Sequence, residues 1–201
     1  MTAARRRLRR TTDRYQWEKD RALLPEDERR RAGAAERDTG LAREELEFST
    51  EFGSAPAGVE LARRFGVPEG TRMLRRTYRT RARGENAPLS LVISWLVYDM
   101  AAANPALLTP ENEPWPGGTP HQLSTIGIEI DRVVDEVTVR LPLPEEARTL
   151  DVPGGVPVLV LRKTSIDTAG RVVEIAECVL PGDRAEIVST TRLQPWPKRN
   201  R

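Results

Sequence analysis

The residues that could carry out catalysis in this 201-residue chain are few, since it has one histidine, His121, and one cysteine, Cys178. A serine or cysteine triad would have to use His121 as its base, and neither kind of nucleophile has a recognisable setting. One imidazole and one thiol cannot supply the clustered ligands of a zinc site. Phosphate-binding glycine loops and a nucleophile elbow are also missing from the sequence. Cys178 lies in an apolar run and is expected to be a buried structural thiol. We therefore predict no enzyme activity, no metal and no cofactor.

Isolated polar residues within apolar segments suit the binding of a small molecule better. Glu174 lies between valines and Ile175, where an unpaired buried carboxylate would be costly; the alternative is that it lies on the polar face of its strand. Thr119 and His121 fall in the first turn of an expected helix, whose free N–H groups favour anions. Thr119 could instead be a plain N-cap, and His121 a partly exposed helix residue.

One hairpin pattern occurs twice and would position these residues. Residues 70–95 and 155–178 each enter on glycine, continue as an apolar-rich segment ending in a basic pair, turn through glycine and return as a second strand. The two copies predict strands at about 71–80 and 88–98 and a second hairpin at about 156–179. They therefore indicate a sheet with two related halves, with a ligand cleft between the sheet and its helices.

Further elements flank the two hairpins. Leu46 to Phe52 alternates with period two, which predicts a strand, and Val59–Phe65 followed by Gly66 predicts a short helix. Residues 99–118 are expected to be mostly loop, with at most one helical turn. The remaining expectations are a helix with Thr119 as N-cap, a strand at 128–141, a helix at 144–150 with acids in its first turn, and a strand at 185–193. This order predicts an α+β fold with a largely antiparallel sheet and flanking helices.

Composition divides the chain into three parts. Residues 1–43 are charged and broken by Pro and Gly, so we expect a linker, disordered or partly helical around residues 14–24, with order beginning at Glu44. Residues 44–193 form the expected domain, and 194–201 a frayed tail. Five arginines and no acid fall in residues 1–10, which could touch nucleic acid or be a solvated end. No apolar run is long enough to span a membrane and the single cysteine fits a reducing compartment, so a cytoplasmic protein is predicted.

Several segments resemble one known family when they are taken together and in order. They are Phe48-Ser-Thr-Glu51, Leu74-Arg-Arg-Thr-Tyr78, Gly118-Thr-Pro-His-Gln-Leu123, Pro144-Glu-Glu-Ala147, Gly155 to Arg162, Gly170-Arg-Val-Val-Glu174 and Pro181-Gly-Asp-Arg184. Over residues 44–193 the chain resembles the UTRA domain, the effector-binding module of HutC-type GntR transcription regulators. The resemblance implies a chorismate-lyase-like fold, a ligand cleft and homodimerisation.

The resemblance also implies a set of ligand-binding residues. These are Phe48, Ser49, Arg76, Tyr78, Val92, Ser94, Thr119, His121, Glu174 and Leu180. Members that respond to sugar phosphates carry arginine, glutamate and tyrosine where this chain has Tyr78, Val92 and Leu180. These replacements remove charge and hydrogen-bonding groups, so we expect an effector less charged than a sugar phosphate.

The expected function is that of an effector-binding and dimerisation domain of a bacterial transcription regulator. No helix-turn-helix can be built from the residues before Glu44. DNA binding is therefore expected only through a winged-helix module outside this chain. Two alternatives remain. One is a stand-alone protein that pairs with full-length regulators, and the other is a chorismate-lyase-like enzyme using Arg76, Arg132 and Glu174.

Overall fold

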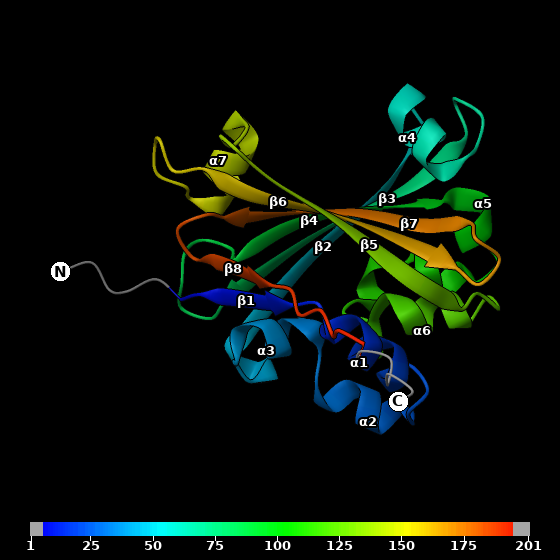
Figure 1. The fold of residues 1–201 in the computed structure, drawn as a ribbon, viewed down its shortest axis with the longest axis horizontal. Coiled ribbons are helices and arrows are strands. Elements are labelled where there is room, and N and C mark those ends of the chain that lie inside the picture. Colours follow the sequence, from blue (N-terminus) through cyan, green and yellow to red (C-terminus); the bar gives the residue numbers. More distant parts are fainter. Residues whose placement is uncertain (1–5, 195–201) are drawn as a thin grey trace, which may run out of the picture.

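A six-stranded antiparallel sheet forms the centre of the molecule (Figure 1). The computed structural model describes residues 6–194. Across the sheet the strands run in the order β2 (Leu46–Pro56), β3 (Arg72–Ala82), β4 (Ser90–Val97), β7 (Val172–Pro181), β6 (Val158–Asp167) and β5 (Ile130–Arg140). The predicted α+β class is confirmed.

The two sequence copies are the hairpins β3–β4 and β6–β7, which meet where β4 pairs with β7. Each copy uses glycine at the same two places. Gly70 and Gly155 precede the first strands with φ of 82° and 81°, and Gly84 and Gly170 lie in the turns with φ of 83° and 79°. Side chains with a Cβ rarely adopt this conformation. The sheet thus has two related halves, as predicted: β2–β3–β4 and β5–β6–β7.

The two faces of the sheet are covered differently. Helices α4 (Val59–Phe65) and α7 (Pro144–Leu150) pack on one face, above the sheet in Figure 1. Both helices have the predicted bounds. The other face is the one onto which Arg76, Ser94 and Ala176 project, since they lie opposite one another across β3, β4 and β7. We call it the cluster face; helix α6 (Gly118–Ser124) lies below it.

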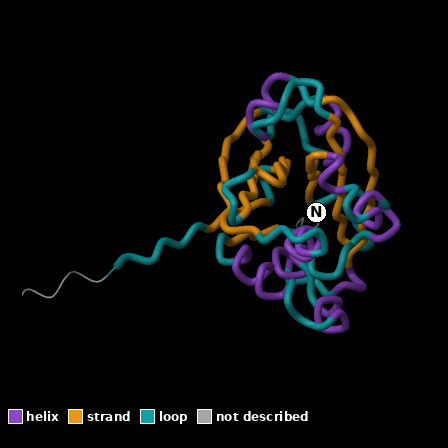
Figure 2. The backbone as a smooth tube through the Cα atoms, turned by 90° about the vertical axis from the view of Figure 1, so that its right-hand side faces the viewer, coloured by secondary structure: helices purple, strands orange, loops and turns teal. Residues whose placement is uncertain are grey.

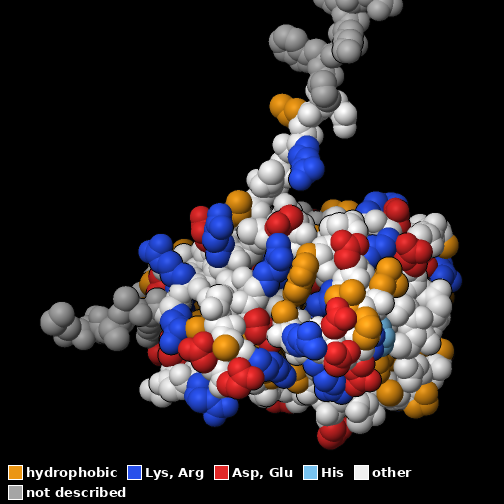
Figure 3. Space-filling model, turned by 90° about the horizontal axis from the view of Figure 1, so that it is seen from below, with side chains coloured by type: hydrophobic (Ala, Val, Ile, Leu, Met, Phe, Trp, Pro, Cys, Tyr) orange, Lys and Arg blue, Asp and Glu red, His pale blue; other side chains and the backbone are white. Residues whose placement is uncertain are grey.

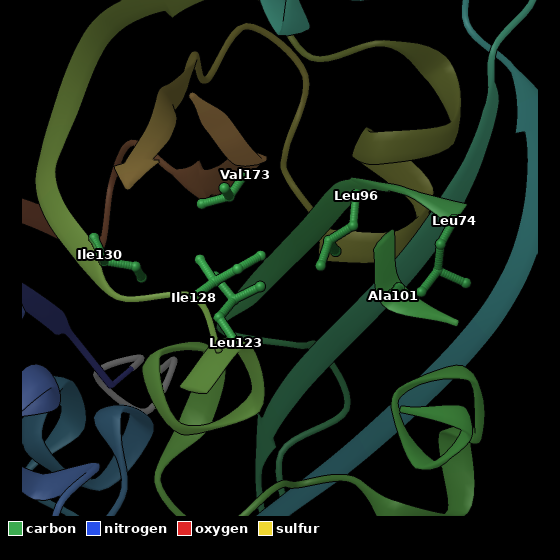
Figure 4. Close-up of a cluster of buried hydrophobic side chains, with 7 residues drawn as sticks. All are labelled: Leu74, Leu96, Ala101, Leu123, Ile128, Ile130 and Val173. Carbon is green, nitrogen blue, oxygen red and sulfur yellow. The ribbon is translucent and has the colours of Figure 1, made fainter. Parts of the chain in front are cut away.

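An apolar cluster holds α6 against the sheet (Figure 4). Leu123 of α6 and Ile128 of the following turn pack with Leu74 of β3 and Leu96 of β4, and all four are buried. Burial of each such side chain contributes about 1.5–3 kcal/mol. This packing fixes the position of α6 over the cluster face.

The segment before Glu44, expected to be a linker, is folded. It contains β1 (Leu8–Thr11), α1 (Arg14–Arg21), α2 (Glu26–Arg31), α3 (Ala34–Thr39) and the short 3₁₀ helix η1 (Arg43–Glu45). We call residues 8–45 the N-terminal segment. Its helices gather below the cluster face (Figures 1 and 2), and β1 pairs in parallel with β8 (Ala185–Val188). Order therefore begins well before Glu44, although α1 lies where a helical stretch was expected.

The segment attaches through charged and polar side chains. Arg14 is buried and bonds to Glu18 and Asp38, while the Tyr15 hydroxyl donates to Asp135 of β5 at 2.8 Å. The Lys19 ammonium group donates to the carbonyl of Ile130 at 2.8 Å. The segment also has an apolar contact, in which Leu8 and Leu41 pack with Leu46. These apolar residues lie in separate elements, so no helix of the segment shows the hydrophobic periodicity that reveals most helices.

Three smaller expectations differ from the structure. The N-cap of α6 is Gly117, with φ of 98°, so Thr119 lies inside the helix and does not cap it. Residues 98–112 contain three short turns of helix rather than one: α5 (Tyr98–Ala101), η2 (Pro105–Leu108) and η3 (Pro110–Asn112). The last strand ends at Val188, and residues 195–201 of the expected tail lie outside the described residues. Within residues 6–194, no helix combines the length and apolar character needed to cross a membrane.

Candidate functional site

A buried charged cluster lies at the centre of the cluster face, around the carboxylate of Glu174. Its Oε1 accepts from Arg76 Nη2 at 3.0 Å, from Ser94 Oγ at 2.7 Å and from Thr119 Oγ1 at 3.3 Å. Its Oε2 lies 2.7 Å from Lys163 Nζ and accepts from Ser165 Oγ at 3.3 Å. The Arg76 and Glu174 side chains are 1% and 2% exposed. These six side chains are the Glu174 cluster.

Strand register explains why the six side chains meet. Arg76 lies opposite Ser94, Ser94 opposite Ala176, and Ala176 opposite Lys163, so one row across the sheet carries both cations. Ser165 lies opposite Glu174 in the neighbouring row, beside a bulge at which Val173 has no partner. Bulges redirect side chains at such places. Thr119 completes the cluster from α6.

The cluster holds Glu174 in its charged form. Burial raises the pKa of Glu174, but Lys163 and Arg76 and the hydrogen bonds from Lys163 and Ser94 outweigh it and lower the pKa to about 2. Such a carboxylate is a stable anion at neutral pH and a poor general acid. The arrangement therefore fits a structural or ligand-orienting role better than proton transfer.

A second layer connects the cluster to the loop before α6. Arg76 Nη1 donates to Gln122 Oε1 at 2.9 Å, and Gln122 Nε2 donates to Glu113 Oε1 at 2.7 Å. The same Glu113 oxygen accepts from the Tyr78 hydroxyl at 3.1 Å. Burial and Glu113 raise the pKa of Tyr78 well above its ordinary value, against the effect of Arg76, so Tyr78 is a neutral donor.

Four of the predicted site residues come into direct contact: Arg76, Ser94, Thr119 and Glu174. Tyr78 joins them through Glu113. The structure also decides two open alternatives. Glu174 is buried and paired rather than on a polar face, and Thr119 bonds to it rather than capping its helix.

The other predicted residues are placed elsewhere. Phe48 and Val92 lie on the cluster face, where Phe48 is opposite Thr80 and Val92 is opposite Tyr78. Leu180 is buried in an apolar cluster with Leu8 and Leu46.

Ser49 and His121 point away from the Glu174 cluster. Ser49 is exposed and lies opposite Arg79, on the other face of the sheet. His121 accepts from Trp115 Nε1 at 2.8 Å and faces a separate hollow with Glu26 and Asn112. Burial and the charge of Arg29 lower the pKa of His121, so it is neutral at pH 7. Neither residue is brought to the cluster by this fold.

Several members of the site went unrecognised in the sequence. Lys163 had a usable signal: Leu161-Arg-Lys-Thr164 repeats Leu74-Arg-Arg-Thr77, which makes Lys163 the counterpart of Arg76. The additional residues are Lys163, Ser165, Gln122 and Glu113. Glu113 lies in a proline-rich loop, where no periodicity predicts where a side chain points.

Two cavities lie on the cluster face, and both are walled in part by the N-terminal segment. Members of the Glu174 cluster line only the smaller one. The smaller, of about 100 Å³, is lined by Lys163, Ser165 and Thr119 together with Tyr15 and Glu18 of α1. Arg132 stands at its rim, 57% exposed and paired with the neighbouring Asp131. The enzyme alternative requires Arg132 to act together with Arg76 and Glu174. In the structure Arg132 is not part of the Glu174 cluster.

The larger cavity has a volume of about 430 Å³, within the range of small-molecule sites. Its lining includes Phe48, Tyr78 and Thr80 of the sheet, Trp115 of the loop before α6, and arginines of the N-terminal segment. Figure 3 views the molecule from this side, where basic and acidic side chains are interspersed. No group of three or more His, Cys, Asp or Glu residues suited to a metal ion occurs within residues 6–194.

Comparison with known proteins points to regulators. Residues 49–186 match the model of a family described as the UTRA domain. A crystal structure of a GntR-family transcriptional regulator matches with 25% identity and a TM-score of 0.73, covering 96% of this chain and 72% of the other.

Two further structures share the fold. PhnF from Mycobacterium smegmatis matches with 20% identity and a TM-score of 0.67, over 96% of this chain and 75% of that one. The C-terminal domain of the histidine utilization repressor from Pseudomonas syringae pv. tomato matches with 18% identity and a TM-score of 0.58, over 77% and 99%. None of the curated proteins matches the sequence.

Proposed function

The chain belongs to the UTRA family, and from this premise we propose that it binds a small-molecule effector on the cluster face and passes the signal to a DNA-binding module of a bacterial transcription regulator. The observation that carries the proposal is the 430 Å³ cavity, which contacts both the family domain and the N-terminal segment. Predicted site residues Phe48 and Tyr78 line it, and Tyr78 connects it to the Glu174 cluster.

Effector binding would act by shifting the equilibrium between two positions of the N-terminal segment. Because the cavity lies between the sheet and the N-terminal segment, an occupant contacts both and favours one position of the segment over another. A ligand shifts such an equilibrium only by its difference in affinity for the two states. A coupling of about 1–3 kcal/mol suffices for regulation. DNA binding in this proposal belongs to a winged-helix module, and the protein works in the cytoplasm.

The proposal is tested by a thermal-shift screen of the chain against sugar phosphates, aromatic acids and apolar metabolites. A ligand at about 100 times its Kd stabilises the folded state by about 2.7 kcal/mol. For a chain of this size that raises the Tm by about 5–10 °C. The stabilisation should fall in Phe48→Ala and Tyr78→Phe, which change the cavity wall. It should persist in Glu177→Gln, because Glu177 lies on the opposite face of β7. A hit unaffected by the first two variants would contradict the site.

Homodimerisation is part of the proposal, with β5 as the contact. β5 is an edge strand and exposes Val137 and Val139, with Leu141 just beyond its end. Unpaired edges with apolar side chains tend to pair with another strand. An antiparallel pairing of two β5 strands centred on Thr138 would place Glu136 of each copy opposite Arg140 of the other.

The dimer contact is tested by light scattering of Val139→Glu. We expect this variant to be monomeric. Val59→Glu, at a position of similar exposure on α4, should remain dimeric. A dimeric Val139→Glu would overturn the assignment to β5.

A further inference from the structure

Two arginines that line the large cavity form no salt bridge with a carboxylate of residues 6–194. Arg21 of α1 is 6% exposed, and its Nε has no hydrogen-bond partner. Its Nη1 donates to the backbone carbonyls of Arg29 and Ala32. Arg29 donates only to backbone carbonyls, those of Pro116 and Leu24. Neither arginine forms a salt bridge within residues 6–194.

The carboxylates near Arg21 are already engaged. Glu18 and Glu36 are close enough to favour the charged form of Arg21. Each is already paired with another arginine, however: Glu18 with Arg14 at 3.0 Å and Glu36 with Arg43 at 3.8 Å. Glu113, on the other wall, accepts from Tyr78, Gln122 and the backbone N–H of Trp115. A buried guanidinium without a counter-charge is costly, and an anion in the cavity would remove that cost.

Both arginines lie beside the backbone at the start of α6, and one of them depends on a glycine there. A Cβ on Gly117 would lie 2.8 Å from Arg29 Cδ, and one on Gly118 would lie 3.6 Å from Arg21 Nη2. The first distance is too short for a Cβ, so glycine at position 117 leaves room for Arg29 and for His121 Cβ, which would lie at 2.6 Å. The second is an ordinary van der Waals distance, and it shows only that Arg21 lies beside Gly118. The cationic part of the cavity is thus next to the loop that carries Trp115.

Three aromatic side chains also line the cavity, beside alanines, prolines and the paired carboxylates of Glu18, Glu36 and Glu113. Phe48, Tyr78 and Trp115 line the cavity, and the Arg43 guanidinium lies 4.1 Å from the centre of the Phe48 ring. Aromatic walls favour a flat apolar body, and guanidinium groups favour a carboxylate. The volume of about 430 Å³ accommodates such a molecule.

We infer that the effector is an aromatic carboxylate, with its ring between Phe48, Tyr78 and Trp115 and its carboxylate at Arg21 and Arg29. This inference rests on the proposed function and adds two points to it. It names the ligand class, and it assigns the anion-binding half of the site to the N-terminal segment, outside the matched residues 49–186. The segment is then part of the site, so binding is coupled directly to its position.

The test is calorimetric titration of the full chain with indole-3-acetate, 4-hydroxybenzoate and phenylacetate, each paired with its neutral amide. At least one acid should bind, and its amide at least tenfold more weakly. Arg21→Gln and Arg29→Gln should each weaken the acid at least tenfold. Arg31→Gln is the matched control: Arg31 is also on α2, carries the same charge and is paired with Asp27 in solvent, so binding should not change.

Other outcomes separate this inference from the proposed function. Equal binding of acid and amide, or full affinity in both Arg21→Gln and Arg29→Gln, overturns the inference. Arg29→Gln keeps the test valid if Arg21→Gln does not fold. If no aromatic acid binds but another compound does, with dependence on Phe48 and Tyr78, the ligand class is wrong and the sensor function stands. Failure of every compound in the wider thermal-shift screen counts against the function itself.

Discussion

The two halves of the sheet share a backbone and differ in chemistry. The row that crosses the sheet at Ser94 and Ala176 reaches Arg76 on one side and Lys163 on the other, at equivalent positions of the repeat. Two residues before Ser94 and Ala176 come Val92 and Glu174, which are also equivalent. Two cations thus converge from both halves on one carboxylate, which only the second half provides.

The comparison shows that the repeat determines the positions of the side chains on the sheet, whereas their chemical roles depend on the residue at each position and on its neighbours. The cations are nearly symmetric, but their surroundings are not. Arg76 is 1% exposed and continues to Gln122 and Glu113, whereas Lys163 is 14% exposed and lines the smaller cavity beside α1. Arg76 is therefore joined to the loop before α6, whereas Lys163 faces α1 of the N-terminal segment.

The largest effect is expected at the residue that makes the halves unequal. Glu174→Gln leaves Arg76 and Lys163 without their shared counter-charge and should lower the free energy of unfolding by about 3–5 kcal/mol. Urea unfolding measures it. Glu177→Gln, on the same strand but paired on the opposite face, should change it by about 0.5 kcal/mol or less. Equal losses in the two variants would mean that the Glu174 cluster does not stabilise the fold.

A comparison of the two cations sharpens the asymmetry. Arg76→Met should cost about 3–4 kcal/mol, because it also leaves Gln122 without its donor. Lys163→Met should cost about 1–2 kcal/mol, since its ammonium group is less deeply buried. Combined with Glu174→Gln, each should cost less than the sum of the single changes. Equal losses for the two cations would show that the halves are energetically equivalent.

The acid dependence of stability should trace to the same carboxylate. The pKa of Glu174 is lowered from 4.5 to about 2, so its stabilising contribution is complete above about pH 4.5 and is lost as the pH falls toward 2. Unfolding free energies measured between pH 6 and 2 should therefore converge for wild type and Glu174→Gln at the acidic end. A constant difference down to pH 2 would contradict the depressed pKa.

The smallest effects are expected where the halves are alike. Gly84→Ala and Gly170→Ala each place a Cβ at positive φ with open space around it, so each should cost about 1–2 kcal/mol, by the same amount in both hairpins. Thermal unfolding measures the change. Gly53→Ala, in β2 without positive φ, should be neutral or slightly stabilising. Clearly unequal costs at Gly84 and Gly170 would show that the turns are not equivalent.

Sequence reasoning succeeded where apolar periodicity and glycine stops act locally. The hairpins and the helices Val59–Phe65 and Pro144–Leu150 follow from such signals. Resemblance to the family indicated Arg76, Ser94, Thr119 and Glu174, but it also included Ser49, which the strand alternation places on the other face. The fold of the N-terminal segment could not be predicted, because its helices attach largely through charges such as Asp135, about 120 residues away along the chain. Its apolar contacts come from single residues of separate elements, such as Leu8 and Leu41, and form no periodic pattern.

The parallel pairing of β1 with β8 connects the beginning of the described chain directly to its last strand. Leu8 to Thr11 lie beside Ala185 to Val188, and Arg9 pairs with Glu186 at 3.3 Å. A force applied at β1 is therefore transmitted to β8 through the hydrogen bonds between the two strands, without passing through the six-stranded sheet. A spectroscopic label on the exposed chain just after Val188 would therefore report a displacement of β1.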